Sequence, residues 1–301
     1  MKFRKIKSAL VAMLRSFALT PTLSYDFKVD NIYYSVISKS NLTCRVTSGN
    51  TKYSGNIKIP KQVTYNKRKF NVTEIAYSAF KGCSGLNSVI IPNSVTGIAN
   101  DAFYGCSSLE KLYISDGSDV LNLGHKRYNS TTYGLFSDCP LKSVYLGRNM
   151  AYRYYTPPFK DKKELSNLTI GNFVTRIGSS SFKGCSGLIS VSIPDSVTEI
   201  GDYAFNGCSS LISVTIGNSV TKIGRSAFYG CSALEGVTSL ATTAPSVYED
   251  TFSIATYLNA MVYVPIGALE SYSVATCWKN FNIEENVDYG VEGIKTDGNL
   301  V

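Results

Sequence analysis

Histidine is almost absent from this sequence, because His125 is the only one in 301 residues. It lies in a polar stretch with no Asp, Glu or Cys at metal-ligand spacing, so neither a metal site nor a Ser–His pair is indicated. The sequence also lacks a Gly-x-Ser-x-Gly nucleophile elbow, a P-loop and a Gly-x-Gly-x-x-Gly motif. Neighbouring acids at Glu249-Asp250 and Glu284-Glu285 are more typical of solvated faces than of an acid–base pair. These absences predict a protein that is not an enzyme and holds no cofactor or metal.

Long apolar runs are also lacking: no stretch reaches 18 apolar residues, so no transmembrane segment is predicted. Residues 1–24 carry five basic residues and no acid, and Ala9–Leu14 is apolar. Small residues at Thr22 and Ser24 precede Tyr25, which is typical of a secretory signal peptide; the alternative is a soluble basic tail. Without residues 1–24 the formal net charge falls from +8 to +3, which is too small to indicate a nucleic-acid partner.

A repeat of 23 residues is the dominant feature of the chain. Three copies begin at Val174, Val197 and Val220 and share the pattern Val-Thr-x-Ile-Gly, then Phe-x-Gly-Cys-Ser, then Leu-x-x-Val-x-Ile. Such a unit cannot bury its apolar residues alone, so neighbouring units stack into a solenoid, and the period lies in the range of leucine-rich repeats. We therefore expect an α/β fold that is mostly β: a leucine-rich-repeat solenoid over residues 72–240 with β-rich end caps.

The segments on either side of the repeats predict these caps, because a solenoid must cover its exposed core and strand edges. Residues 25–71 alternate as strands and contain a hairpin turn at Asn66-Lys67, which predicts an N-terminal β cap. Residues 241–287 predict a C-terminal cap and residues 288–301 a linker or tail. In the C-terminal cap we expect a strand at Met261–Pro265, a short helix within 267–277 with Leu269 and Tyr272 inward, and Trp278 and Phe281 closing the core.

Six cysteines share one repeat position, so stacking predicts a ladder of thiols through the core: Cys83, Cys106, Cys139, Cys185, Cys208 and Cys231. Disulfides are disfavoured because like positions in stacked coils point their side chains in parallel. The spacing of 23 residues is not a zinc spacing. We interpret these cysteines as small buried side chains with weak S–H donors. The state of Cys44 and Cys277, in the caps, is left open.

Two surfaces are candidates for ligand binding. The first is the outward side of the repeated strand, because solenoids often bind ligands on this sheet. Its side chains are mostly small and polar, and only Lys111, Tyr113 and Tyr145 are typical anchors. The complete row is Ser88, Ile90, Lys111, Tyr113, Ser143, Tyr145, Asn167, Thr169, Ser190, Ser192, Ser213 and Thr215.

The second candidate surface combines two departures from the repeat, which stacking brings side by side. An insertion of about ten residues lies within Gly124–Gly134, and the next coil loses the consensus around Arg148–Phe159. Tyr and Arg are common interface anchors, and departures from a repeat rule often mark function. The predicted anchors are Lys126, Arg127, Tyr128, Tyr133, Arg148, Tyr152, Arg153 and Tyr155, whereas Tyr154 falls on an inward position. The alternative is a tolerated irregular coil whose tyrosines cover the core.

The repeat line Ser-Val-Thr-x-Ile-Gly-x-x-Ala-Phe-x-Gly-Cys-Ser-x-Leu-x-Ser-Val-x-Ile-Pro resembles that of the BspA-like leucine-rich-repeat surface proteins of Bacteroides-type bacteria, over about residues 72–240. The resemblance implies a secreted or cell-surface, non-enzymatic, adhesin-like protein that binds an extracellular protein or glycan. The alternative is a structural or self-associating surface component without a specific host ligand. The sequence leaves the ligand, the anchoring mode and the oligomeric state open.

Overall fold

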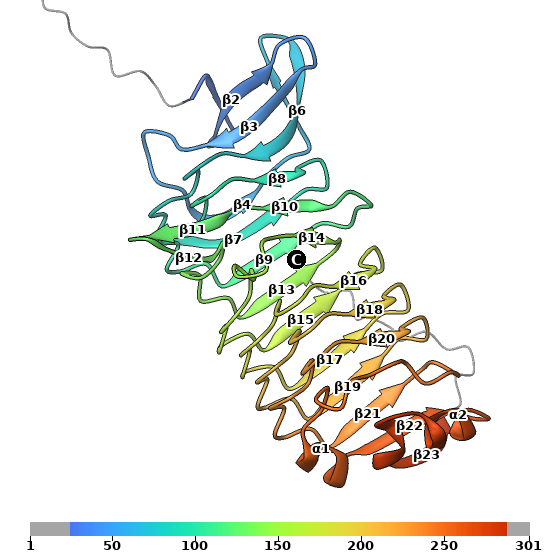
Figure 1. The fold of residues 1–301 in the computed structure, drawn as a ribbon. Helices are drawn as coiled ribbons and strands as arrows, with labels where there is room; N and C mark the ends of the chain where they lie inside the picture. Colours follow the sequence, from blue (N-terminus) through green and yellow to red (C-terminus); the bar gives the residue numbers. More distant parts are fainter. Residues whose placement is uncertain (1–24, 288–301) are drawn as a thin grey trace, which may run out of the picture.

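The computed structural model describes residues 25–287, which form an elongated stack of coils with one strand of each coil on a common face (Figure 1). The strands of this face pair in parallel within two sheets. The first sheet contains β4 (Ser54–Lys58), β7 (Gly85–Ile91), β9 (Lys111–Ile114), β13 (Ser143–Leu146) and β15 (Asn167–Ile170). The second contains β17 (Ser190–Ile193), β19 (Ser213–Ile216), β21 (Gly236–Ser239), β22 (Met261–Pro265) and β23 (Asn282–Val287). The predicted mostly-β solenoid is confirmed.

The Val-Thr-x-Ile-Gly segments and the residues that replace them in the irregular coils form a second, narrower row of parallel strands on the return path of each coil. These strands are β8 (Gly97–Ile98), β10 (Leu121–Leu123), β14 (Met150–Ala151), β16 (Arg176–Ile177), β18 (Glu199–Ile200) and β20 (Lys222–Ile223). Their valine and isoleucine side chains point inward and are buried, as at Val197 and Ile200. The outward Ser190 and Ser192 on the broad face are exposed, which confirms the predicted alternation along that strand.

The N-terminal segment extends the return-path sheet with β1 (Phe27–Val29), β2 (Ile32–Ser38), β3 (Thr43–Thr47), β5 (Gln62–Tyr65) and β6 (Arg68–Ile75). β5 and β6 form the predicted hairpin: Tyr65 lies opposite Arg68, and Asn66 and Lys67 have φ of 48° and 60°. β6 continues through position 71 and pairs with β8, so the cap and the first coil share one sheet. Residues 1–24, where a signal peptide is predicted, lie outside the described residues.

The C-terminal end is covered by α1 (Ile254–Asn259), α2 (Leu269–Val274) and the 3₁₀ turn η1 (Trp278–Asn280). Trp278 and Phe281 are buried, and the indole of Trp278 donates to the carbonyl of Pro245 at 2.7 Å. Tyr272 points inward as predicted, but Leu269 is 41% exposed, so its predicted inward orientation is wrong. Leu269 starts α2 where its amide donates to a carboxylate oxygen of Glu285, and this leaves its side chain facing solvent. The predicted tail at 288–301 lies beyond the described residues.

Two ladders run through the core and hold the coils in register. The phenylalanine ladder joins Phe80, Phe103, Phe136, Phe159, Phe182, Phe205, Phe228 and Phe252, with neighbouring ring centroids 5.0–5.6 Å apart. In the thiol ladder each Sγ from Cys106 onward donates to the carbonyl of the phenylalanine in the preceding coil, as in Cys208 to Phe182 at 3.3 Å. All eight cysteines are buried free thiols, Cys44 and Cys277 included. The interpretation of the repeat cysteines as buried weak donors is confirmed.

Candidate functional site

The inserted residues form a β-hairpin that projects from one edge of the stack (Figure 1). Its strands are β11 (His125–Tyr128) and β12 (Thr131–Gly134), with Asn129 at a positive φ of 44° in the turn. The preceding coil holds its base: Asn100 Oδ1 accepts from the amide of His125 at 3.0 Å, and Asp101 Oδ1 accepts from the amide of Arg127 at 2.7 Å. The hairpin is therefore a fixed projection rather than a loose insertion.

Lys126 is enclosed by the hairpin instead of standing free on its surface. Its ammonium lies 5.1 Å from the ring centroids of Tyr104 and Tyr133 and 5.8 Å from that of Tyr128. The same ammonium forms an ion pair with Asp138. Cation–π contacts of this kind stabilise the arrangement and orient the rings. The expectation that Lys126 is itself an available anchor is corrected: it positions Tyr128 and Tyr133.

The coil that follows the hairpin is shifted in register, so Tyr152 and not Tyr154 occupies the inward position. β14 pairs with β10 so that Ala151 lies beside Asn122, and one residue further Tyr152 takes the inward position beside Leu123. Seven positions separate Tyr152 from Phe159, against five from Ile177 to Phe182, so two residues bulge outward. Tyr154 is therefore 66% exposed, and the prediction of a core role for it is wrong.

Tyr152 is held by the next coil and is not an available anchor. Its hydroxyl donates to the carbonyl of Ser179 at 2.8 Å and lies 2.9 Å from Oγ of Ser181. Burial raises the pKa of Tyr152 to about 12, so the hydroxyl stays protonated. A Cβ at Gly178 would lie 2.2 Å from the Tyr152 hydroxyl oxygen, so glycine is required where this ring crosses the next coil.

Arg148 is fully buried, so the prediction that it contacts a ligand is wrong. Its guanidinium donates to the carbonyls of Pro92 at 2.9 Å and Asn93 at 3.0 Å, more than 50 residues earlier in the chain. Burial lowers the pKa of Arg148, and the nearby charge of Asp119 opposes that shift. The side chain of Arg148 therefore links the turn that carries it to the turn at Pro92 and Asn93.

Lys162 occupies the position that cysteine holds in the regular coils. Its ammonium donates to the carbonyls of Ser137 and Cys139, both at 2.8 Å. Desolvation lowers the pKa of Lys162. A long side chain thus supplies the donor that a thiol supplies elsewhere in the ladder.

What stays exposed is a set of six side chains that we call the tyrosine–arginine patch. Its members come from the hairpin and the bulge: Arg127, Tyr128, Tyr133, Arg153, Tyr154 and Tyr155. The two elements are in contact, since a Cβ at Gly134 would lie 2.1 Å from the carbonyl oxygen of Pro157. Within residues 25–287 neither guanidinium of the patch has an acidic partner. Arg153 instead donates to the hydroxyl of Tyr155 at 3.2 Å.

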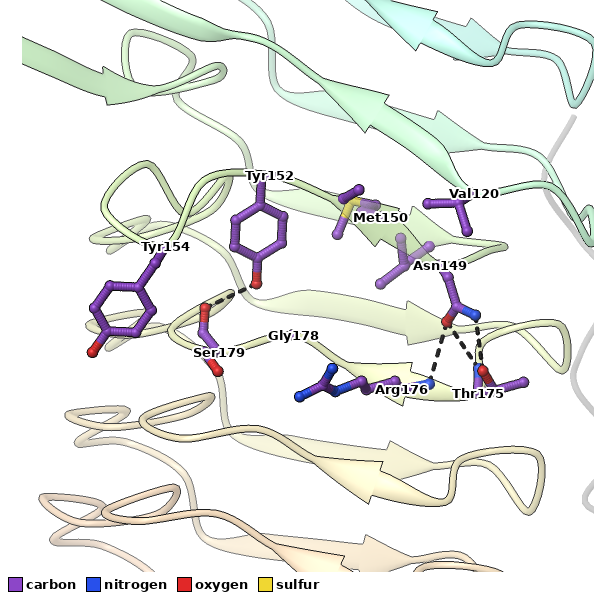
Figure 2. Close-up of a pocket in the computed structure, with 11 residues that line it drawn as sticks. Val120, Asn149, Met150, Tyr152, Tyr154, Thr175, Arg176, Gly178 and Ser179 are labelled. Atoms are coloured by element: carbon purple, nitrogen blue, oxygen red, sulfur yellow. Dashed lines mark hydrogen bonds between the residues drawn. The ribbon is translucent and has the colours of Figure 1, made fainter.

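A pocket of about 480 Å³ opens beside the patch, with Tyr154 on its rim (Figure 2). It lies between β14 and β16, where the return-path row of strands is interrupted. The row on the broad face is interrupted at the same step of the repeat, between β15 and β17. We call this interruption the seam. Asn149 bridges it, because its Oδ1 accepts from the amides of Thr175 at 3.0 Å and Arg176 at 3.2 Å. The lining is Val120, Leu146, Asn149, Met150, Ala151, Tyr152, Tyr154, Thr175, Arg176, Gly178 and Ser179.

The three candidates on the broad face belong to β9 and β13, apart from the hairpin and the bulge. Tyr113 and Tyr145 stack with centroids 4.3 Å apart and an interplanar angle of 7°, so each ring covers a face of the other. The hydroxyl of Tyr145 donates to the carboxylate of Asp116 at 2.8 Å. Lys111 lies in the neighbouring row and is exposed. These side chains present ring edges and one cation, a smaller surface than the tyrosine–arginine patch.

His125 is buried at the base of the hairpin, and its Nε2 has no hydrogen-bond partner. Burial lowers its pKa, and the charges of Arg153 and Arg127 add to the effect, so the ring is neutral at pH 7. In the described part of the chain, no three His, Cys, Asp or Glu side chains gather as metal ligands would. None of the helices between residues 25 and 287 has the length and apolar character needed to cross a bilayer.

Comparison with known proteins gives a family match over most of the chain. The sequence profile described as "BspA type Leucine rich repeat region" matches six copies within residues 56–133 and 153–279. No curated protein matches the chain.

Comparison with solved structures also gives matches, of which we report three. A leucine-rich repeat protein from Bacteroides ovatus is 22% identical, with 80% of this chain and 71% of that one covered and a TM-score of 0.42. A leucine-rich cell-surface protein from Faecalibacterium prausnitzii is 19% identical, with 87% and 95% covered and a TM-score of 0.32. The pneumococcal vaccine antigen PcpA is 16% identical, with 88% and 100% covered and a TM-score of 0.40.

Proposed function

Because the chain belongs to the BspA-type leucine-rich repeat family, we propose that it is a secreted or cell-surface protein that binds an extracellular protein or glycan. The tyrosine–arginine patch is the proposed binding site, and no catalytic step is involved. The observation that carries the proposal is the concentration of four exposed tyrosines and two exposed arginines on two adjoining projections.

Preorganisation of the patch supports this role, since a rigid surface loses little entropy when it binds. Lys126 fixes the rings of Tyr128 and Tyr133 from behind, and Asn100 and Asp101 hold the strand that carries them. Tyrosine offers a large contact area with few rotatable bonds, and arginine and tyrosine dominate measured interface hot spots.

The charge of the patch favours a ligand with carboxylate or sulfate groups. Arg127 and Arg153 have no acidic partner within the described residues, so an anionic ligand gains charge-assisted hydrogen bonds without breaking an ion pair. The pocket beside Tyr154 adds apolar surface from Met150, Val120 and Leu146. The proposed ligand is therefore an acidic glycan or an acidic protein segment that also offers an apolar group.

The test is binding to an array of extracellular-matrix proteins, mucins and glycans, with the triple variant Tyr128→Ala/Arg153→Ala/Tyr154→Ala measured beside the parent chain. We expect saturable binding that falls at least about tenfold in the variant, the loss that about 1.4 kcal/mol corresponds to. Tyr77→Ala/Tyr229→Ala/Lys61→Ala is the matched control, because these side chains are equally exposed but lie outside the patch.

The broad face provides the competing location. If binding survives the triple variant but is lost in Lys111→Ala/Tyr113→Ala, the ligand occupies the broad face and the patch proposal is wrong. If the chain binds nothing on the array, the alternative of a structural or self-associating surface component is favoured.

A further inference from the structure

The parallel ladder of the broad face begins and ends with strands whose outer edges are open. β4 is the first strand and β23 the last, and among residues 25–287 no strand pairs with the outer edge of either. Strand edges of this kind present unpaired amide and carbonyl groups that another chain can use. Because the strands within each of the two sheets of this face are parallel, the open edge of β4 and the open edge of β23 are opposite sides of the same kind of parallel ladder.

The pairing registers show which residues of the two edges share a column. Lys58 lies beside Ile90, and the column continues through Tyr113, Tyr145 and Thr169. Beyond the seam the same repeat position continues as Ser192, Thr215, Thr238, Tyr263 and Glu284. The neighbouring column starts at Asn56 and ends at Asn282. One further step of the ladder, about 4.8 Å, would therefore place Lys58 beside Glu284 and Asn56 beside Asn282.

The two ends also carry opposite net charge. Residues 25–81 contain ten Lys and Arg and three Asp and Glu, a formal net charge of +7. Residues 241–287 contain one Lys and five Asp and Glu, a formal net charge of −4. All ten basic residues of the first segment are exposed, and so are Glu249, Glu270, Glu284 and Glu285 of the second. Opposite fields at the two ends favour approach of one end to the other.

Charged residues on edge strands normally prevent pairing between copies. Here the charges oppose pairing of two like ends but not pairing of one end with the other. Two β4 edges would bring together two ends of net charge +7, and two β23 edges would bring Glu284 and Glu285 together. Like charges in close pairs are destabilising, so both symmetric arrangements are disfavoured. The unlike arrangement brings opposite charges together, and it is the one that preserves the direction of the ladder.

We propose that copies of this chain associate head to tail, with β23 of one copy pairing in parallel with β4 of the next and a Lys58–Glu284 ion pair across each junction. Such a contact is heterologous, so it adds further copies in the same direction instead of closing at a dimer. It uses none of the six residues of the tyrosine–arginine patch, so it stands or falls separately from the proposed ligand binding.

The first experiment is sedimentation velocity on the full-length chain over a concentration series at about 0.01 M and about 1 M salt, where the Debye lengths are about 30 Å and 3 Å. The weight-average sedimentation coefficient should rise with concentration at low salt and stay at the monomer value at high salt. Lys58→Glu alone and Glu284→Lys alone should each weaken association by about tenfold or more, equivalent to about 1.4 kcal/mol per junction. The double variant Lys58→Glu/Glu284→Lys should restore it.

Cysteine cross-linking tests the register. Asn56→Cys and Asn282→Cys are exposed single substitutions, whereas the eight native thiols are buried. Under mild oxidation a mixture of the two variants should give a cross-linked dimer that neither variant gives alone. A chain that stays monomeric at every concentration, or cross-links that form equally within each variant, would overturn the proposal. Association that ignores both charge reversals would also overturn it and would point to the exposed apolar face of α1 at Ile254 and Leu258.

Discussion

The regular coils at residues 174–231 and the irregular coils at residues 121–162 share one core but connect their surfaces in different ways. Phenylalanines stack through both regions, with centroids 5.4 Å apart from Phe182 to Phe205 and 5.6 Å from Phe136 to Phe159. In the regular region main-chain groups join neighbouring coils, as when the amide of Gly201 donates to the carbonyl of Ile177 at 2.8 Å. In the irregular region strand pairs also join the coils, and long side chains add further bonds between them: Asn149, Tyr152, Arg148 and Lys162.

A solenoid tolerates large changes at its surface when the stacked core is kept. A unit of the array contacts only its neighbours, so an insertion needs new partners only in the adjoining coils. The irregular coils obtain those partners from long polar side chains, and the same insertion and bulge expose tyrosines and arginines. Between the return-path strand and the core phenylalanine the regular coils carry only a short segment, such as residues 201–204 between Ile200 and Phe205.

Alkaline pH should produce the largest effect, because it ionises buried thiols, of which the regular coils carry three and the irregular coils one. A thiol such as Cys231 ionises near pH 9.0 when unfolded, whereas burial raises its pKa in the folded chain to about 12. Between these values the unfolded chain binds fewer protons, so the free energy of unfolding falls as pH rises from about 9 to about 12. Urea unfolding at a series of pH values measures this loss.

Two substitutions, one in each region, test which buried groups cause the alkaline loss of stability. Cys231→Ala should make the alkaline loss shallower. Lys162→Cys should make the alkaline loss steeper. The pKa of Lys162 is lowered in the folded chain, so its contribution to the free energy of unfolding increases as pH rises to 10.5, whereas the contribution of a buried thiol decreases. Equal pH dependence in all three proteins would contradict the assignment of these buried groups.

Loss of a core ring should be the next largest effect and should be equal in the two regions. Phe205→Ala and Phe159→Ala each remove a fully buried ring, so each should lower the free energy of unfolding by about 3–5 kcal/mol. Chemical denaturation of the two variants checks this, with the exposed Tyr229→Ala as the control. A loss below about 1 kcal/mol for Phe159→Ala alone would show that the irregular region does not share the core.

Replacing the buried Arg148 should cost more stability than replacing an arginine at the surface. Arg148→Met leaves the carbonyls of Pro92 and Asn93 without a donor, and we expect a loss of about 1–3 kcal/mol in the free energy of unfolding. Arg176→Ala removes an exposed ion pair with Glu199 and should cost less than about 1 kcal/mol. The two variants are compared by thermal and urea unfolding, and equal losses would place Arg148 among ordinary surface residues.

The smallest expected effect is the difference in free energy of unfolding between Tyr152→Phe and Tyr154→Phe. Tyr152→Phe removes a hydroxyl bonded to Ser179 and Ser181, which should cost about 1 kcal/mol. Tyr154→Phe alters a solvent-exposed hydroxyl and should stay within about 0.5 kcal/mol of the parent. The reverse ranking would mean that the coil follows the undisturbed 23-residue phase after all.

The regular architecture could be predicted from the sequence because each position repeats its environment. The ladders of Phe205 and Cys208, the turn at Asn66-Lys67 and the strand at Met261–Pro265 follow from period, alternation and turn chemistry. In these segments the residues that decide the structure lie within one repeat of each other.

The irregular coils could be located but not assigned residue by residue. Leu146 and Phe159 are 13 positions apart, against 12 from Ile170 to Phe182, so the spacing signals one extra residue without saying where the chain bulges. Counting back from Phe159 put Tyr154 inward, whereas strand pairing with β10 puts Tyr152 there. The partners of Arg148 lie 55 and 56 residues away and follow from no local pattern.

The seam has a consequence for how the chain folds and opens. In a one-dimensional array, cooperativity is transmitted by nearest-neighbour coupling, and that coupling is weakest where fewest bonds cross from one coil to the next. Both rows of strands stop at the seam, while the phenylalanine stack continues across it with centroids 5.4 Å apart. We therefore expect hydrogen exchange to divide the protein there into two cooperative units, with amides near Ile177 opening at lower free energy than those near Ile200.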